Sequence, residues 1–252
     1  MPLRLQQEQL LNDARKFSLT VSDDYFAKKE LVFNGFKWGS GKKKLLITHG
    51  WGSKAADFAD LIVALKEIDN LEIIAFDAPG NGSSEGDLSN LLLYILAIKA
   101  ITREFGKTDI LIGHSLGAMA NVIALSDIDY APSLLISMAP LVRLKENFED
   151  SMLAVGVPQT AQDNFLKSFE EKFGKPVSHY NLMDWYPADV PYKHFLMYDQ
   201  NDLISTYNYL KEFLETYPSI QSRSYEGVGH DRIIKSVQVI ADLVNVVKTN
   251  LN

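Results

Sequence analysis

The amino-acid sequence predicts an α/β domain built on a mostly parallel sheet and carrying one helical insertion. Short, continuous apolar runs alternate along the chain with amphipathic helical stretches. This pattern is typical of βαβ units whose sheet is buried on both faces. The alternation stops over 141–187 and resumes at 193. A chain of 252 residues fits one core domain, residues 1–140 and 188–252, that carries 141–187 as an insertion.

The N-terminal segment precedes the alternating part of the chain. We expect an amphipathic helix over 1–16, followed by strands at 17–21 and 31–38. The glycine-rich segment GSGKKK at 39–44 predicts a hairpin turn that leads into the next strand.

The rest of the chain predicts further strands and the helices between them. Strands are expected at 45–48, 72–76, 109–113, 134–137, 193–198 and 221–225. Helices are expected at 54–67, 88–105, from 116 onward, at 144–155, 160–173 and 204–216, and after His230. In the insertion, Gly156 and Gly174 directly follow the periodic stretches, as is typical of helix ends.

The composition excludes several classes of protein. The absence of cysteine excludes disulfides, thiolate metal sites and a cysteine nucleophile. The 25 basic and 32 acidic side chains give a formal net charge of −7, which disfavours nucleic acid or an anionic membrane as a partner. The N-terminus lacks the apolar core of a signal peptide, and the apolar run at 91–98 is far shorter than the roughly 20 residues of a membrane span. We therefore expect a cytoplasmic protein.

The segment Gly113-His114-Ser115-Leu116-Gly117 follows an apolar strand and precedes a helical stretch. A G-x-S-x-G sequence on a strand-to-helix turn is typical of a nucleophile elbow, which holds the serine exposed at the carboxyl edge of the sheet. The helix N-terminus behind the serine favours an oxyanion, because its free amides carry partial positive charge. Ser115 is therefore the predicted nucleophile.

A serine hydroxyl needs a base that accepts its proton, and the chain has five histidines. His230 lies in a glycine-rich loop between the last strand and the last helix, where it can reach the carboxyl edge of the sheet. We predict His230 as the base and expect the side chain of His114 to point away from the active face. Of the remaining histidines, His49 ends a strand, His179 lies in the insertion and His194 begins a strand.

The base needs a carboxylate that fixes its tautomer and stabilises the imidazolium. In a hydrolase elbow the chain order is serine, acid, histidine. Two aspartates in this interval follow the strand at 193–198, namely Asp199 and Asp202. We predict Asp202 as the acid because it lies further out from the strand end, and we expect Asp199 to shape the strand exit or cap a turn.

An oxyanion also needs hydrogen-bond donors. One predicted donor is the backbone N–H of Leu116, the residue after the nucleophile. The other is the backbone N–H of Trp51, because Gly50 and Gly52 on either side allow this amide to turn toward the reacting carbon. The Trp51 indole is then free to line an acyl pocket, and plain loop packing is the alternative for this residue.

The sequence resembles the α/β-hydrolase superfamily from about residue 31 onward. The matching segments are LLITHGWGS (45–53), FDAPGNGSSEG (76–86), IGHSLGAM (112–119), MYDQNDLIS (197–205) and EGVGHDRII (226–234). The resemblance implies an α/β-hydrolase fold, with an eight-stranded, mostly parallel sheet and a small helical cap, 141–187, over Ser115. Asn81 stands where many relatives carry a histidine that has no role in the triad.

The nucleophile narrows the reaction that the resemblance implies. Haloalkane dehalogenases and epoxide hydrolases of this fold carry aspartate at the elbow and dienelactone hydrolases carry cysteine, whereas this chain carries serine. The prediction is a serine hydrolase that forms an acyl-enzyme, acting as a carboxylesterase. A thioesterase, a lactonase, a C–C hydrolase and a catalytically silent binding protein are the alternatives. No metal ion or organic cofactor is implied.

The substrate prediction depends on the insertion. Its apolar side chains either face a pocket or pack the helices onto the sheet, and they are Met152, Leu153, Val155, Phe165, Phe169, Phe173, Trp185 and Tyr186. An insertion of this small size favours a small or medium acyl group on a small-molecule substrate.

Overall fold

A sheet of eight strands forms the centre of the computed structural model, which describes residues 3–251. The strand order is β1-β2-β4-β3-β5-β6-β7-β8. β2 pairs antiparallel with β1 and β4, and the other neighbours are parallel. The strands are β1 (Arg15–Asp23), β2 (Lys29–Trp38), β3 (Lys43–Thr48), β4 (Leu71–Phe76), β5 (Ile110–His114), β6 (Leu134–Met138), β7 (Lys193–Asp199) and β8 (Gln221–Tyr225). The predicted eight-stranded, mostly parallel sheet is confirmed.

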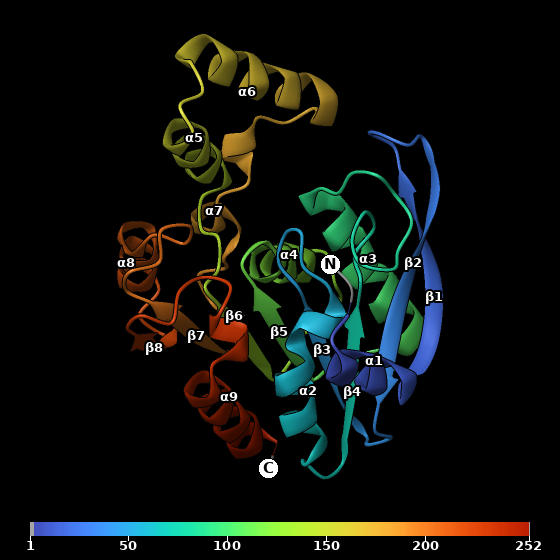
Figure 1. Ribbon diagram of the computed structural model, residues 1–252. Helices are drawn as coiled ribbons and strands as arrows, with labels where there is room; N and C mark the ends of the chain where they lie inside the picture. The colour runs from blue at the N-terminus through green and yellow to red at the C-terminus, as the bar shows by residue number, and fades with distance from the viewer. Residues whose placement is uncertain (1–2, 252) are drawn as a thin grey trace.

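Helices cover both faces of this sheet (Figure 1). The α-helices are α1 (Leu5–Asn12), α2 (Ala59–Lys66), α3 (Leu91–Phe105), α4 (Leu116–Leu125), α5 (Leu144–Ala154), α6 (Gln159–Phe173), α7 (Leu182–Trp185), α8 (Tyr207–Thr216) and α9 (Val237–Asn250). The 3-10 helices are η1 (Ala55–Phe58), η2 (Val177–His179) and η3 (Ile233–Lys235). Within residues 3–251, no helix is long and apolar enough to cross a membrane.

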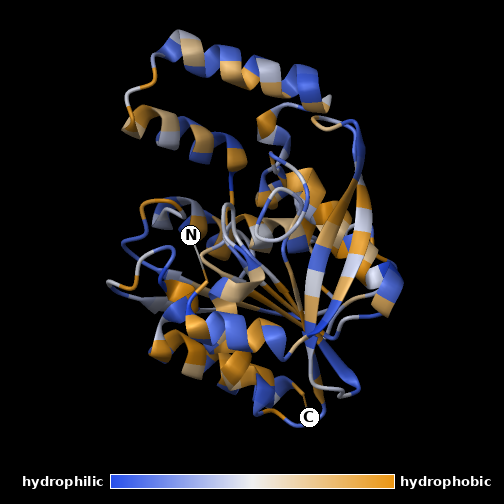
Figure 2. Cartoon of the chain, turned by 45° about the vertical axis from the view of Figure 1, so that its right-hand side comes forward, coloured by the Kyte–Doolittle hydropathy of each residue, from blue (hydrophilic) through white to orange (hydrophobic). Residues whose placement is uncertain are grey.

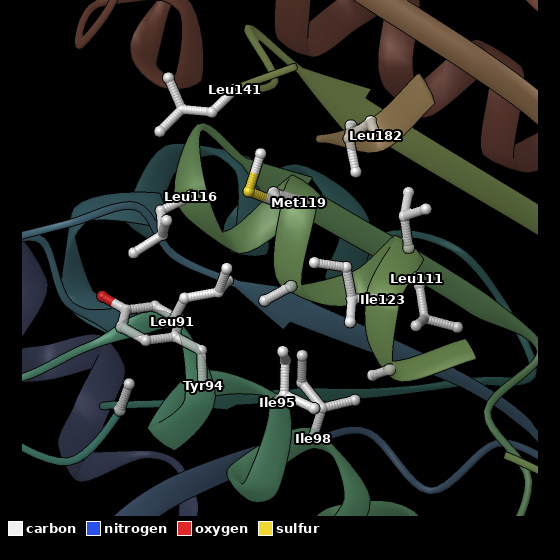
Figure 3. Close-up of a cluster of buried hydrophobic side chains, with 14 of the residues drawn as sticks. Leu91, Tyr94, Ile95, Ile98, Leu111, Leu116, Met119, Ile123, Leu141 and Leu182 are labelled. Atoms are coloured by element: carbon white, nitrogen blue, oxygen red, sulfur yellow. The ribbon is translucent and has the colours of Figure 1, made fainter. Parts of the chain in front are cut away.

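Each face of the sheet has its own hydrophobic core. Successive side chains of a strand point to opposite faces, so Leu46 of β3 packs with α3 and α4, whereas Leu45 and Ile47 pack with α2 and α9. Figure 3 shows part of the core that contains Leu46, in which Leu91 of α3 and Leu116 of α4 come from adjacent helices. These two cores hold the ends of β3 and β5 in fixed positions.

The predicted hairpin at 39–44 is wrong. β2 and β3 are not neighbours, because β4 lies between them in the sheet. Glycine is required at 39 and 41 because the chain there passes close to the backbone of residues 70 and 71, where β4 begins. A Cβ atom on Gly41 would lie 1.8 Å from the Asn70 carbonyl carbon, and one on Gly39 would lie 2.3 Å from the Leu71 carbonyl oxygen.

The hairpin instead joins β1 and β2 through residues 24–28, which contain neither glycine nor proline. The Asp23 carboxylate replaces those turn residues, since it accepts hydrogen bonds from the N–H groups of Tyr25, Phe26 and Ala27. The predicted helix over 1–16 is also too long. It ends at Asn12, and β1 begins at Arg15, while residues 1 and 2 lie outside the described residues.

The segment between β6 and β7 is helical, as predicted. The helices expected at 144–155 and 160–173 are α5 and α6. They lie side by side at one end of the molecule, beyond the sheet (Figures 1 and 2). Hydrophilic and hydrophobic residues alternate along α6, whereas the central strands are hydrophobic (Figure 2). The assignment of 141–187 as a cap, and of 1–140 and 188–252 as the core domain, stays a prediction.

Candidate active site

Ser115 occupies a strained turn between β5 and α4. Its backbone has φ 52° and ψ −120°, a conformation that non-glycine residues rarely adopt and that is frequent at functional sites. The Ser115 N–H donates to the Met138 carbonyl at 3.0 Å, so the neighbouring strand β6 holds the turn. The geometry is that of a nucleophile elbow.

The two glycines of the motif are required by close contacts. A Cβ atom on Gly113 would lie 2.5 Å from the Cα of Ala118 in α4. One on Gly117 would lie 2.3 Å from the His49 carbonyl oxygen. The turn therefore brings β5, α4 and the end of β3 closer together than any side chain would permit.

The three predicted triad residues are in hydrogen-bond contact, although they come from three separate parts of the chain. His230 Nε2 lies 2.9 Å from Ser115 Oγ, and His230 Nδ1 lies 2.7 Å from Asp202 Oδ2. Because a carboxylate only accepts hydrogen bonds, Nδ1 carries the proton of the neutral ring. Nε2 is then free to accept the hydrogen of the serine hydroxyl.

Asp202 is held as a carboxylate. Burial would raise its pKa, but the hydrogen bond and charge of His230 together with the N–H groups of Ile204 and Ser205 hold the pKa of Asp202 below its usual value. These two amides donate to Oδ1 at 2.8 and 3.0 Å, which leaves Oδ2 for His230. The side chain of Asp202 is 1% exposed, and that of His230 is 9% exposed.

Asp199 has no hydrogen bond to His230 among the described residues. Its carboxylate accepts from the N–H of Gly229 at 2.6 Å and from that of Asn201 at 2.9 Å. Burial raises the pKa of Asp199, but the hydrogen bonds from backbone N–H groups outweigh this effect. The pKa of Asp199 therefore lies below its usual value. Asp199 thus ties the loop that bears His230 to the loop that bears Asp202, in keeping with its expected place at the strand exit.

The prediction that the side chain of His114 points away from the active face is wrong. Its ring lies 4.9 Å from the ring of His230, and its Nε2–H donates to the His230 carbonyl at 3.0 Å. Burial, with the neighbouring imidazole of His230, lowers the pKa of His114 to about 3, so the ring is neutral. The sequence motif shows no signal for this contact, because the loop that carries His230 is remote in the chain.

The loop after β3 lies directly against the serine. A Cβ atom on Gly50 would lie 3.2 Å from the Cβ of Ser115. The Gly50 carbonyl accepts three hydrogen bonds, from His49 Nδ1–H at 2.7 Å, the Tyr94 hydroxyl at 2.9 Å and the Ser53 N–H at 3.2 Å. The peptide is trans, so the Trp51 N–H points opposite to this anchored carbonyl. Within residues 3–251, no acceptor binds the N–H of Trp51 or Leu116.

A cavity of about 1000 Å³ contains Ser115 and His230. Trp51, Leu144 and Phe148 line it on the side of the helical insertion, and the charged side chains of Asp57, Asp231 and Lys235 line other parts. Trp51 is 57% exposed as a residue, and its indole packs edge-on against Phe148 at 6.5 Å. The site can therefore admit a small organic molecule.

The other histidines are not part of the hydrogen-bond chain from Ser115 through His230 to Asp202. His49 is buried in the loop after β3, His179 packs on Trp185 in the insertion, and His194 is buried beside Ser137 and Tyr186. Within residues 3–251, no group of three or more His, Asp or Glu side chains is placed to hold a metal ion.

The sheet order and the serine on its strand-to-helix turn define the α/β-hydrolase class of proteins. The chain belongs to the alpha/beta hydrolase family, whose model matches residues 45–242. No curated protein matches the chain in sequence.

Solved structures of the same fold extend over almost the whole chain. A putative hydrolase from Agrobacterium vitis is 14% identical, with a TM-score of 0.74, and the match covers 95% of this chain and 99% of that one. An esterase from Pyrococcus furiosus is 19% identical, with a TM-score of 0.66 and coverage of 94% and 91%. The mouse alpha/beta hydrolase domain-containing protein 10 is 17% identical, with a TM-score of 0.68 and coverage of 92% and 97%.

Proposed function

We propose that this protein is a serine hydrolase that cleaves an ester bond through an acyl-enzyme intermediate, as a carboxylesterase on a small or medium acyl group. The observation that carries the proposal is the chain of hydrogen bonds from Ser115 Oγ to His230 Nε2 and from His230 Nδ1 to Asp202. The esterase structure from Pyrococcus furiosus supports it as a distant similarity.

In the proposed reaction, Ser115 Oγ attacks the carbonyl carbon of the ester while its proton passes to His230 Nε2. The tetrahedral intermediate collapses, the bond to the alcohol oxygen breaks, and the alcohol leaves with that proton. Water then attacks the acyl-enzyme, with His230 as base, and releases the carboxylic acid. Asp202 stabilises the imidazolium in both halves, since its pKa is held below the usual value.

The proposed oxyanion donors are the N–H groups of Trp51 and Leu116. Leu116 is the first residue of α4, where backbone N–H groups have no intrahelical acceptor. The three hydrogen bonds on the Gly50 carbonyl orient the Trp51 N–H in advance. Donors fixed before the reaction stabilise the oxyanion without a reorganisation cost.

The insertion, 141–187, is proposed to act as the cap of this site. Leu144 and Phe148 of α5 line the cavity that contains Ser115. Arg143, at the start of α5, forms a salt bridge with Glu212 of α8 at 2.5 Å, which joins the insertion to the core.

The test is a panel of ethyl esters, acyl thioesters and lactones with short acyl chains, compared between wild type and Ser115→Ala. We expect ester hydrolysis in the wild type and almost none in the variant. Preferential turnover of thioesters or lactones would replace the ester assignment within the same mechanism. Equal turnover by the two proteins would contradict the proposed nucleophile.

A further inference from the structure

A small aromatic cavity lies beside the cavity that contains Ser115. Its volume is about 120 Å³, and Trp51, Leu144 and Phe148 line both spaces. The two cavities therefore adjoin at the loop that carries the proposed oxyanion donor.

Aromatic side chains of the insertion and of the β1–β2 turn build much of the wall of the small cavity. Phe148 of α5 packs edge-on against Phe165 and Phe169 of α6, with ring centroids 5.3 and 6.2 Å apart. Phe173, at the end of α6, packs on Phe169 at 4.4 Å and on Phe26 of the β1–β2 turn at 5.8 Å. Interlocked rings of this kind give a rigid, apolar wall.

Asn90 introduces a hydrogen-bond donor into this apolar wall. It lines the cavity at the start of α3, is only 6% exposed, and caps the helix because its Oδ1 accepts from the Leu93 N–H at 3.0 Å. The amide Nδ2 is buried and has no hydrogen-bond partner among residues 3–251. An unpaired buried donor is destabilising, so an acceptor placed in the cavity would be bound favourably.

We propose that this cavity binds the acyl side chain of the substrate and that Asn90 Nδ2 donates a hydrogen bond to an acceptor on that side chain. The inference rests on the proposed function and names its substrate class. A cavity of roughly 150 Å³ holds the six carbons of benzene, or about 25 Å³ per non-hydrogen atom, so a cavity of about 120 Å³ holds roughly five such atoms. The substrate class is therefore esters of short oxo- or alkoxy-substituted carboxylic acids.

The larger cavity suits the alcohol part of such an ester. The charged side chains of Asp57, Asp231 and Lys235 line it, and an apolar acyl chain placed there would leave them partly desolvated. The acyl side chain is accommodated better among the aromatic rings.

The experiment compares two pairs of ethyl esters that differ in the acceptor alone. In the first pair, 4-oxopentanoate has a carbonyl oxygen where 4-methylpentanoate has a methyl group. In the second, 4-methoxybutanoate has an ether oxygen where hexanoate has a methylene. Each side chain has about five non-hydrogen atoms beyond the ester carbonyl, in accord with the cavity volume. We expect the wild type to have a kcat/KM about five- to tenfold higher for the acceptor-bearing member of at least one pair.

Two variants remove the amide donor and keep the helix cap. The serine hydroxyl can also donate, but its oxygen lies one bond closer to the main chain than Asn90 Nδ2, whereas the aspartate carboxylate only accepts. Asn90→Ser and Asn90→Asp both retain an oxygen for the Leu93 N–H, and serine, aspartate and asparagine cap helices about equally well. The ratio should fall toward 1 in Asn90→Ser, whose shorter side chain draws the donor back from the cavity, and below 1 in Asn90→Asp, because the carboxylate repels the acceptor. Asn181→Ser is the matched control, since Asn181 caps α7 through the Met183 N–H and does not line this cavity.

The results separate this inference from the proposed function. Ester hydrolysis with the same acceptor preference in wild type and both Asn90 variants would overturn the role of the small cavity alone. Absence of hydrolysis for every ester would overturn the proposed function and this inference with it. If Asn90→Asp does not fold, as judged by thermal unfolding, Asn90→Ser decides the question.

Discussion

Residues 3–251 contain two serine–histidine pairs with nearly the same hydrogen-bond length. Ser115 Oγ lies 2.9 Å from His230 Nε2, and Ser137 Oγ lies 2.8 Å from His194 Nε2. The second pair joins the adjacent strands β6 and β7. The separation of the two atoms therefore does not distinguish a candidate catalytic pair from a structural one.

The surroundings of the two pairs differ in three respects. Ser115 has a φ of 52°, whereas Ser137 lies inside a regular strand. The Nδ1 of His230 faces the Asp202 carboxylate, whereas that of His194 faces the Tyr186 hydroxyl at 3.1 Å. Ser115 lines a cavity of about 1000 Å³, and the second pair lines none of the cavities described above. Backbone strain, a carboxylate and access distinguish the first pair.

The largest expected difference between the pairs is in turnover. Ser115→Ala should lower kcat for ester hydrolysis by about 10³- to 10⁶-fold, because no nucleophile remains. Ser137→Ala should leave kcat within about threefold of wild type, since it removes one structural hydrogen bond. Steady-state kinetics on a short ethyl ester measure both, and a comparable loss in Ser137→Ala would break the distinction.

The next difference is between the partners of the two imidazoles. Asp202→Asn should lower kcat by about 10³- to 10⁴-fold, because an amide favours the wrong tautomer of His230 and cannot stabilise the imidazolium. Tyr186→Phe, which removes the corresponding partner of His194, should have little effect on kcat. The comparison is again one of rates, and an active Asp202→Asn enzyme would move the acid role to Asp199.

The third difference is in stability against pH. Burial lowers the pKa of His194 to about 3 from an ordinary value of 6.5, so the unfolded chain binds a proton that the folded chain does not. The stability that neutral His194 contributes is present above pH 6.5 and is lost as the pH falls toward 3. Between pH 6.5 and 4.5 this loss is about 2 kcal/mol. Urea unfolding at several pH values should show a shallower decline in His194→Gln than in wild type. Parallel pH profiles would show that His194 is not held neutral.

The smallest expected effect is the fall in kcat when a hydrogen bond that orients the proposed oxyanion donor, the Trp51 N–H, is removed. Tyr94→Phe removes one of the three hydrogen bonds on the Gly50 carbonyl and should lower kcat about tenfold with little change in KM. Tyr130→Phe is the matched control, because the Tyr130 hydroxyl bonds the Thr108 N–H at 2.9 Å, away from the site. A larger change in KM than in kcat would indicate that Tyr94 acts on substrate binding.

The sequence allows the elbow and the strands to be predicted because their signals are local. The glycines of G-x-S-x-G correspond to contacts with no room for a Cβ atom, and apolar runs correspond to buried strands. Chain order leaves Asp199 and Asp202 as candidates for the acid, and the distance from the strand end favours Asp202. In the structure it is Asp202 that faces His230.

The features that the sequence did not predict depend on pairing between distant segments. The turn at 39–44 has hairpin composition, but β2 pairs with β1 and β4 and not with β3, and no local signal encodes that choice. The contact between His114 and the His230 carbonyl joins residues far apart in sequence. The same holds for the aromatic cavity, whose walls come from the β1–β2 turn, α3 and the insertion.

Covalent labelling with a fluorophosphonate tests the central claim most directly, because the reagent modifies only a serine activated by a base and accessible to solvent. Intact mass and peptide mapping should show one adduct per chain, located on Ser115, in wild type and Ser137→Ala, and none in Ser115→Ala. An unlabelled wild type, or an adduct that persists in Ser115→Ala, would contradict the assignment of Ser115 as the nucleophile.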